Sequence, residues 1–141
     1  MPISKLRISE TYHPMKISLV SIPVLDPIAA HEIYTSKLGF ATKEFDPSAS
    51  LAIVVSSDDV DGVAILLEPC QGSFAENYQK SAFEANLPIM ALESNNVDIE
   101  LKRLEAAGVI LRPELNNPKW GIQNVFEDGC GNLLMIEQRL A

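Results

Sequence analysis

The stretch VLDPIAAHEIYTSKLGF at residues 24–40 defines how the chain begins to fold. The apolar, β-branched run 16–24 leads into it and is typical of a strand. Asp26 and Pro27 then predict a helix start, because aspartate caps free N–H groups and proline suits the first helical position. Gly39 predicts the end of the helix, since glycine readily adopts the left-handed conformation found there. We therefore expect strand, helix and strand.

The same order of elements is predicted twice along the chain. Strands are expected where short apolar runs are bounded by turn residues. A second helix is expected over 97–107, with Asn95 or Asn96 as its cap and Gly108 as its end. The predicted strands span 16–24, 40–45, 51–57 and 63–69, and then 87–93, 109–115 (in whole or in part), 120–127 and 133–138. Residues 70–86 are predicted as a long polar connection.

A constant spacing of 69 residues supports an internal repeat. It relates two helix caps, two helix ends, two turns and two strand ends: Asp26 and Asn95, Gly39 and Gly108, Gly62 and Gly131, and Glu68 and Glu137. These matches favour a duplicated βαβββ module. The alternatives are two unrelated α+β halves or a ferredoxin-like βαββαβ domain.

The length of 141 residues favours one domain. We expect a polar N-terminal arm over 1–14 and a single domain over 15–141. Its two modules span about 15–70 and 87–139 and are joined by a linker over 71–86.

Charge and composition exclude several kinds of partner. The net charge is −8, from 11 Lys and Arg against 19 Asp and Glu, which argues against nucleic acids and anionic membranes. We find no apolar run of about 18 residues, the length that suggests a membrane-spanning helix, and no apolar signal segment. The two cysteines, Cys70 and Cys130, fit neither a disulfide framework nor a zinc pattern, so we expect a cytoplasmic protein.

Several motifs resemble the vicinal oxygen chelate superfamily, which includes glyoxalase I, bleomycin-resistance proteins and extradiol dioxygenases. The first-half motifs are Val24-Leu25-Asp26, Ile33-Tyr34 and Lys37-Leu38-Gly39-Phe40; the second-half motifs are Trp120-Gly121, Phe126-Glu127-Asp128 and Gly131-Asn132. Gly129 stands where the family usually has proline. The resemblance implies an α+β fold in which tandem βαβββ modules form a cupped, barrel-like mixed sheet with helices outside. It also implies a homodimer.

The resemblance further implies where a metal ion is bound in metal-dependent members, at one residue on the first and last strand of each module. In this chain those positions carry Leu19, Leu66 (or Ile65, if the register slips by one), Pro88 and Met135. None of these side chains is a ligand for a hard or borderline divalent ion. We therefore expect that the metal site has been lost and that no cofactor is needed.

The expected ligand pocket is an apolar cup with two carboxylates near its mouth. Trp120 begins a strand that lines the cup, with Ile122 and Asn124 on the same face. The pocket residues are predicted to be Leu19, Leu66, Glu68, Trp120, Asn124, Met135 and Glu137. This composition favours metal-independent binding of a small organic molecule that is cationic or neutral.

Two other functions remain open. One is a lyase, isomerase or dioxygenase-like enzyme that uses Glu68 or Glu137 as a base, or a metal at a shifted position. The other is a structural or regulatory dimer whose own side chains fill the cup. His13, in the arm, and His31, on the exposed side of a helix, are not expected to act in catalysis. Cys130 is expected to be exposed and unreactive, because nearby acidic groups raise the pKa of a thiol.

Overall fold

The computed structural model describes residues 11–117 and 124–139. The first module contains β1 (Leu19–Val24), α2 (Pro27–Ser36), β2 (Ala41–Asp46), a 3-10 turn (Pro47–Ala49), β3 (Leu51–Val55) and β4 (Ala64–Pro69). Its sheet has the strand order β1-β4-β3-β2, in which β1 and β4 are parallel and the other pairs are antiparallel.

The second module follows after a helical linker. It contains β5 (Met90–Ser94), α4 (Val97–Ala106), a 3-10 turn (Pro113–Leu115), β6 (Asn124–Glu127) and β7 (Leu133–Gln138). Its described strands form a sheet of order β5-β7-β6, with β5 and β7 parallel. The parallel pair of first and last strands thus recurs in both modules, and the predicted α+β class is confirmed.

The local signals that predicted the helices act as expected. Asp26 caps α2, because its carboxylate accepts hydrogen bonds from the N–H groups of Ile28 and Ala29. Asn96 caps α4 by accepting a hydrogen bond from the N–H of Ile99 at 3.1 Å. Of the two predicted alternatives, the structure therefore selects Asn96 over Asn95.

The linker differs from the prediction. Residues 70–86 were expected to be a polar connection, but they contain the helix α3 (Phe74–Glu84), which Ser73 caps through its hydroxyl oxygen. The helix was missed because its buried residues are few and include the polar Gln79.

The strand predicted at 109–115 is reduced to one isolated bridge between Leu111 and Phe126. A 3-10 turn beginning at Pro113 follows the bridge. Proline has no N–H to donate, so it cannot continue a regular ladder.

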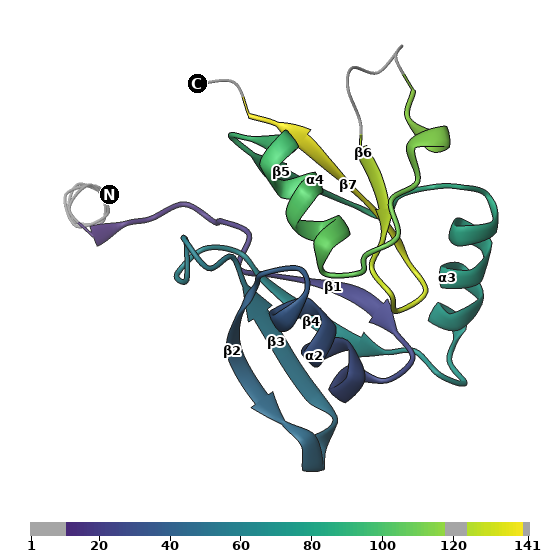
Figure 1. The fold of residues 1–141 in the computed structure, drawn as a ribbon. Helices are drawn as coiled ribbons and strands as arrows, with labels where there is room; N and C mark the ends of the chain where they lie inside the picture. Colours follow the sequence, from purple (N-terminus) through teal and green to yellow (C-terminus); the bar gives the residue numbers. More distant parts are fainter. Residues whose placement is uncertain (1–10, 118–123, 140–141) are drawn as a thin grey trace.

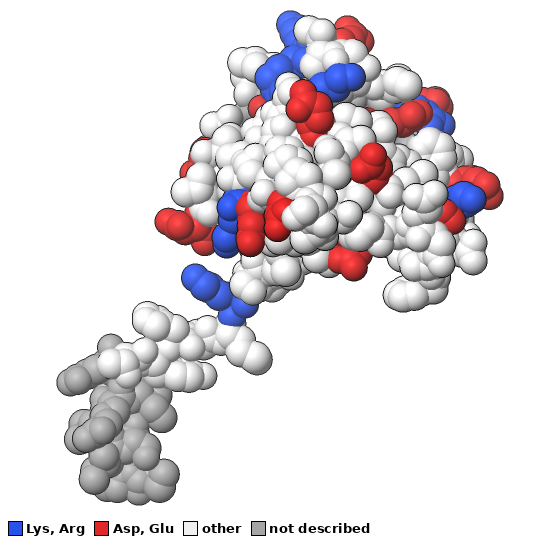
Figure 2. Space-filling view, turned by 90° about the horizontal axis from the view of Figure 1, so that it is seen from below, with Lys and Arg blue, Asp and Glu red and all other residues white. Residues whose placement is uncertain are grey.

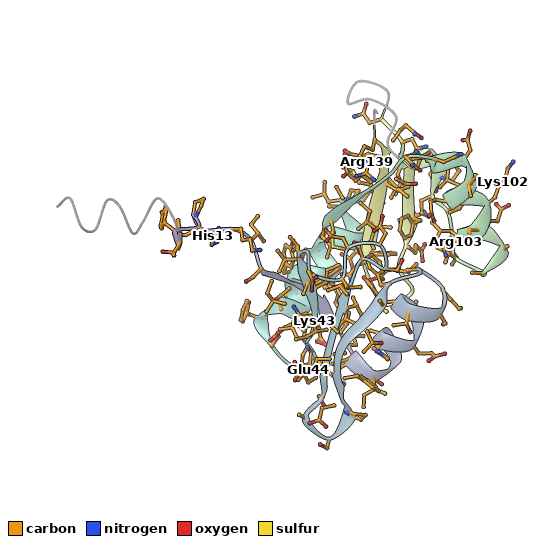
Figure 3. All side chains as sticks on the ribbon, turned by 90° about the vertical axis from the view of Figure 1, so that its left-hand side faces the viewer. His13, Lys43, Glu44, Lys102, Arg103 and Arg139 are labelled. Atoms are coloured by element: carbon orange, nitrogen blue, oxygen red, sulfur yellow. The ribbon has the colours of Figure 1, made fainter. Side chains whose placement is uncertain are left out.

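The two sheets share one core but do not join. The helices α2 and α4 lie on the same side of the molecule, and α3 lies on the opposite side (Figure 1 and Figure 3). One cluster of buried apolar residues runs from α2 and its sheet to α4 and its sheet, including Tyr34, Leu67, Leu104 and Phe126. No described strand of one sheet pairs with the other, so the expected barrel-like sheet is not closed within one chain.

On the face shown in Figure 2, charged residues are scattered among uncharged ones and do not form one large patch. In Figure 2, acidic side chains are dispersed over the face in view, with lysine and arginine among them. No helix within the described residues is long and apolar enough to cross a membrane.

Candidate functional site

The first sheet has one face turned toward α2 and one face turned away from it. Ile22, Val24 and Leu67 are buried on the α2 face, with at most 2% of their surface exposed. Because side chains alternate along a strand, Leu19 and Leu66 lie on the other face. Leu19 is 46% exposed and Leu66 is partly exposed, so this face presents apolar surface.

The register extends this surface across the sheet. Ile53 on β3 is directly opposite Leu66 on β4, and both are partly exposed. Glu68 lies two residues after Leu66, on the same face and partly buried. These residues form what we call the open face of the first sheet: Leu19, Ile53, Leu66 and Glu68.

The corresponding face of the second sheet holds only some of the predicted pocket residues. Met135 and Glu137 share the face turned away from α4, with Met135 partly buried and Glu137 exposed. Asn124 is opposite Ile136, which belongs to the buried core, so Asn124 lies on the other face from Met135. Trp120 lies outside the described residues.

The register also refines the position of the fourth family ligand site. Leu19 is opposite Ala64, and its counterpart in the second module is Ile89, whose N–H donates to Leu133 at 2.9 Å. Equivalent positions in the first strands and the helices of the two modules are therefore 70 residues apart, whereas Gly39 and Gly108 are 69 apart. The difference arises because the connection between α4 and Gly108 is one residue shorter than the connection between α2 and Gly39. Ile89, rather than Pro88, matches Leu19.

With Ile89 in place of Pro88, the side chains at the four family metal positions are still apolar. Three of these positions carry hydrocarbon side chains (Leu19, Leu66 and Ile89), and Met135 carries a soft thioether. None of the four supplies a hard donor atom. No group of three or more His, Cys, Asp or Glu side chains suited to a metal ion occurs within the described residues. The residues present therefore do not fit a divalent metal at the family position.

One chain does not bring the two candidate carboxylates together. Strand β4, which carries Glu68, ends where the chain turns toward α3. Strand β7, which carries Glu137, ends on the other side of the molecule beside the C-terminus (Figure 1). Glu137 instead neighbours Glu93, its partner on β5.

A buried polar cluster that the sequence did not reveal joins the two modules. It consists of Tyr34, Gln79, Asp128 and Asn132. The Tyr34 hydroxyl donates to Asp128 at 2.6 Å, and the Asn132 amide donates to the same carboxylate at 2.8 Å. Burial and the nearby Asp128 carboxylate together raise the pKa of Tyr34 well above its ordinary value.

The linker helix completes this cluster. The Gln79 amide donates to the backbone oxygens of Pro23 at 2.9 Å and Cys130 at 3.0 Å, and to Asn132 at 3.2 Å. No buried side-chain nitrogen or oxygen within the described part of the chain lacks a partner. Each buried polar atom of the cluster is therefore partnered within the protein, and the bonds connect the first module, the linker helix and the second module. The motif residues Asp128 and Asn132 thus take part in the contact between the modules.

The histidines and cysteines do not assemble into a catalytic group. His31 stacks on Phe45 at 3.9 Å and bonds Thr42 at 2.7 Å, while His13 lies on the arm, away from the domain (Figure 3). Cys130 was expected to be exposed, but it is half-buried. Burial first, and then the charges of Asp128 and Asp26, raise its pKa to about 12. The thiol is therefore a poor nucleophile at neutral pH.

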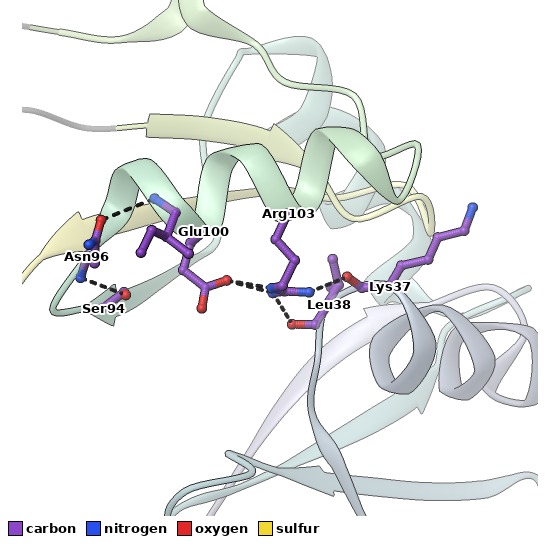
Figure 4. Close-up of polar contacts among 7 residues, drawn as sticks. Lys37, Leu38, Ser94, Asn96, Glu100 and Arg103 are labelled. Atoms are coloured by element: carbon purple, nitrogen blue, oxygen red, sulfur yellow. Dashed lines mark hydrogen bonds and ion pairs between the residues drawn. The ribbon is translucent and has the colours of Figure 1, made fainter.

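Arg103 forms a second connection between the modules. From α4 its guanidinium donates to the backbone oxygens of Lys37 and Leu38, each at 3.0 Å, at the end of α2 (Figure 4). Glu100 holds the same guanidinium at 2.7 Å. We call this arrangement the Arg103 clamp.

A cavity of about 700 Å³ lies beside the Arg103 clamp. Its apolar walls are provided by Leu38, Phe40, Leu92, Leu104, Phe126 and Ile136. None of the described residues predicted to line a pocket borders this cavity. No local pattern in the sequence predicts this cavity, because it forms where the two modules meet.

Comparisons with known proteins agree with this architecture. The chain is 39% identical over 127 residues to an uncharacterized protein, YurT, of Bacillus subtilis (strain 168), covering 89% of this chain and 100% of that protein. Its fold is similar to that of TnmS3, an antibiotic binding protein from Streptomyces sp. CB03234, with a TM-score of 0.66, 23% identity and coverage of 90% and 98%.

A further similar fold is that of a bleomycin-binding protein from Streptomyces verticillus complexed with copper(II)-bleomycin, with a TM-score of 0.59, 13% identity and coverage of 91% and 99%. The model of the Glyoxalase/Bleomycin resistance protein/Dioxygenase superfamily matches residues 16–136. This match covers nearly all of both modules, and the chain belongs to that superfamily.

Proposed function

We propose that this protein binds a small organic molecule without a metal ion. The observation that carries the proposal is the open face of the first sheet, where Leu19, Ile53 and Leu66 leave apolar surface partly exposed on a rigid sheet. Exposed apolar surface of this kind marks ligand or partner sites. The apolar residues at the four family metal positions are consistent with a ligand held by contact and not by coordination.

The charge at this site supports a cationic or neutral ligand. Glu68 is part of the open face, and the chain as a whole carries a net charge of −8. An anionic ligand would have to overcome this field. The antibiotic-binding and bleomycin-binding proteins with similar folds also support a small organic ligand.

We propose that the site is completed in a homodimer. The strands β1 and β5 each end a sheet, and unpaired sheet edges invite pairing with another chain. The linker helix adds exposed aromatic surface, with Phe74 at 89% and Tyr78 at 55% exposure. A dimer in the reducing cytoplasm is consistent with Cys70 and Cys130, which are both free thiols.

The test combines metal analysis with ligand screening. We expect no stoichiometric metal in untagged, dialysed protein, and a raised Tm with at least one member of a panel of cationic and neutral antibiotics that includes bleomycin. Leu19→Arg should weaken that binding by about tenfold or more, because it places a charge on the apolar surface. Ile99→Arg is the control, since Ile99 is 61% exposed on α4.

Two results would contradict the proposal. About one metal ion per chain would favour metal-dependent catalysis, and the absence of any ligand-induced Tm shift would favour a dimer without a pocket. Glu68→Gln and Glu137→Gln test the enzymatic alternative, because a catalytic carboxylate is lost in each variant.

A further inference from the structure

Residues 12–18, which we call the leading segment, carry apolar side chains that their own domain does not cover. The segment leads into β1 and projects away from both sheets (Figure 1 and Figure 3). Met15 is fully exposed, and Ile17 and Tyr12 are 68% and 62% exposed. Apolar surface gathered on a projecting segment marks an interaction site. We therefore looked for a surface that fits this segment.

The N-terminal part of the chain and the rest of it carry opposite net charges. Residues 1–18 hold three Lys and Arg against one Glu, a net charge of +2, so residues 19–141 carry −10. This difference favours contact between the leading segment and an acidic protein surface. A second copy of the same chain offers such a surface.

The outer edge of β5 offers backbone groups to an added strand. Because β5 is the outermost strand of its sheet, this edge has no strand partner among the described residues. Residues 15–18 have the length of a short strand, and Pro14, which has no N–H to donate, sets where pairing begins. The homodimer proposed above uses the β5 edge for pairing, and the leading segment is a suitable strand for that edge.

The charges on β5 and β7 favour a cation on a strand added beside β5. Glu93 on β5 is directly opposite Glu137 on β7, and both are exposed. Like charges directly opposite each other on a sheet are destabilising. Arg139 contacts Glu93 at 3.6 Å and offsets part of this repulsion. Lys16, placed next to Glu93 on an added strand, would offset more of it.

The cavity beside the Arg103 clamp accounts for the apolar side of the leading segment. Because side chains alternate along a strand, Met15 and Ile17 lie on the opposite face from Lys16, the face on which Leu92 borders the cavity. The cavity of about 700 Å³ has room for more than one side chain. Its lining combines the apolar walls described above with polar residues: Ser56, Ser57, Glu93, Ser94, Glu100 and Arg103. Such a mixed lining suits a peptide segment, which has apolar side chains and a polar backbone.

We propose that the leading segment of one subunit adds to β5 of its partner as a short strand. Met15 and Ile17 enter the partner's cavity, and Lys16 pairs with the partner's Glu93. Main-chain hydrogen bonds supply affinity in strand addition of this kind. The partner returns the same segment, so the exchange closes as a two-fold dimer. The inference rests on the proposed homodimer and goes beyond it by naming the segments that meet.

A charge-swap experiment on the full-length chain tests the pairing of Lys16 with the partner's Glu93. Lys16→Glu and Glu93→Lys each put like charges into both contacts of a dimer, so each variant alone should dimerise about tenfold more weakly in sedimentation equilibrium. An equimolar mixture should recover the parent affinity, because both contacts of a mixed dimer join opposite charges. With one variant ¹⁵N-labelled, native mass spectrometry detects the mixed dimer.

Matched variants on α4 control for the change of net charge. Lys102→Glu and Glu105→Lys alter exposed residues away from β5. Each alone should leave the dimer affinity unchanged, and mixing the two should have no effect.

A paired substitution tests the entry of the apolar side chains into the cavity. The double variant Met15→Ser, Ile17→Ser should weaken the dimer by about a hundredfold, because four apolar side chains per dimer lose their burial. Both residues are exposed in the single chain, so the variant should keep the parent circular dichroism spectrum. Ile99→Ser, at a residue 61% exposed on α4, is the control and should leave the affinity unchanged.

Failure of this inference can be told apart from failure of the proposed function. A dimer that is indifferent to the Lys16, Glu93 and leading-segment variants overturns this inference alone. Weakened dimers that do not recover on mixing also overturn it, because the segment would then lie on its own β5. If the double variant instead abolishes binding to anionic lipid vesicles and leaves dimerisation unchanged, the partner is a membrane and the inference fails. A monomeric parent chain overturns both this inference and the homodimer, whereas ligand binding at the open face is measured separately through Tm.

Discussion

Asp128 is a carboxylate with 1% of its surface exposed, so its charge has to be compensated inside the protein. Four donors reach it: the Tyr34 hydroxyl, the Asn132 side-chain amide, and the backbone N–H groups of Cys130 and Asn132. Removing one of these donors leaves an oxygen atom partly unpaired in a dry site. The cost is larger than for an exposed hydrogen bond.

Tyr34→Phe tests this cost with almost no change of shape. The variant removes the hydroxyl that donates to Asp128, and we expect the free energy of unfolding to fall by about 1–3 kcal/mol. Tyr78→Phe, at a tyrosine that is 55% exposed, should change it by less than about 0.5 kcal/mol. Urea denaturation followed by circular dichroism provides the measurement, and equal values for the two variants would refute the prediction.

The raised pKa of Cys130 predicts how the free energy of unfolding changes at alkaline pH. Its pKa is raised to about 12 in the folded chain from an ordinary value of 9.0. Above pH 9 the unfolded chain loses this proton while the folded chain keeps it, so rising pH favours unfolding. Because Cys130 is partly exposed, solvent screening reduces the expected contribution to about 1 kcal/mol at pH 10.

Cys130→Ser isolates this contribution from those of other groups. The difference in unfolding free energy between the variant and the parent should shift by about 1 kcal/mol in favour of the variant between pH 7.5 and pH 10. A difference that is constant over this range would show that the folded thiol titrates normally.

The two helix-ending glycines provide a matched pair at the level of the elements. Gly39 and Gly108 have φ values of +89° and +87°, in a region that other residues rarely adopt. They differ in their surroundings: a Cβ at Gly39 would lie 3.3 Å from the Arg103 guanidinium, whereas a Cβ at Gly108 would meet nothing within 4 Å. The backbone conformation is thus shared, and the close approach of α4 is particular to Gly39.

Gly39→Ala should therefore destabilise the protein more than Gly108→Ala. We expect about 1–2 kcal/mol for Gly108→Ala from backbone strain alone, and about 1 kcal/mol more for Gly39→Ala. In an Arg103→Ala background the difference should disappear, because the clashing group is gone. A difference that survives this double-mutant cycle would show that the Arg103 clamp is not its cause.

The sequence predicted the elements whose signals are local. The cap at Asp26, the stops at Gly39 and Gly108, and the strand over 133–138 agree with the structure. The helix α3 was missed because it docks through Gln79, a polar residue that hydropathy patterns place on the surface. The shortened strand after Gly108 was missed because pairing depends on a distant partner, Phe126.

Local sequence signals predicted the candidate site only in part. Motif counting places Leu19, Leu66 and Met135 on their strands, but a one-residue difference between the modules moves the remaining position from Pro88 to Ile89. Asn124 is on the other face because strand register is set by pairing with β7. The cavity beside the Arg103 clamp depends on how the modules meet, which no local pattern encodes.

At the scale of the whole molecule, the shared core predicts that both modules unfold together. Buried residues of the first sheet and of α4 belong to one cluster, and the polar cluster adds connections between the modules. Differential scanning calorimetry should show one transition, with equal calorimetric and van't Hoff enthalpies. Asn132→Ala should lower its Tm without dividing it, and two resolved transitions would contradict this account.

The bond from the Asn132 side chain to the backbone oxygen of Pro23 has a consequence for synthesis, because its partners are 109 residues apart in the chain. A growing chain makes its first module long before the turn that closes over it. Until the second module has left the ribosome, the apolar side of the first module has no cover from α4 and β7. The nascent chain is therefore most prone to aggregate after its first module has emerged and before β7 can pack against it, and chaperones have the most to protect in that interval.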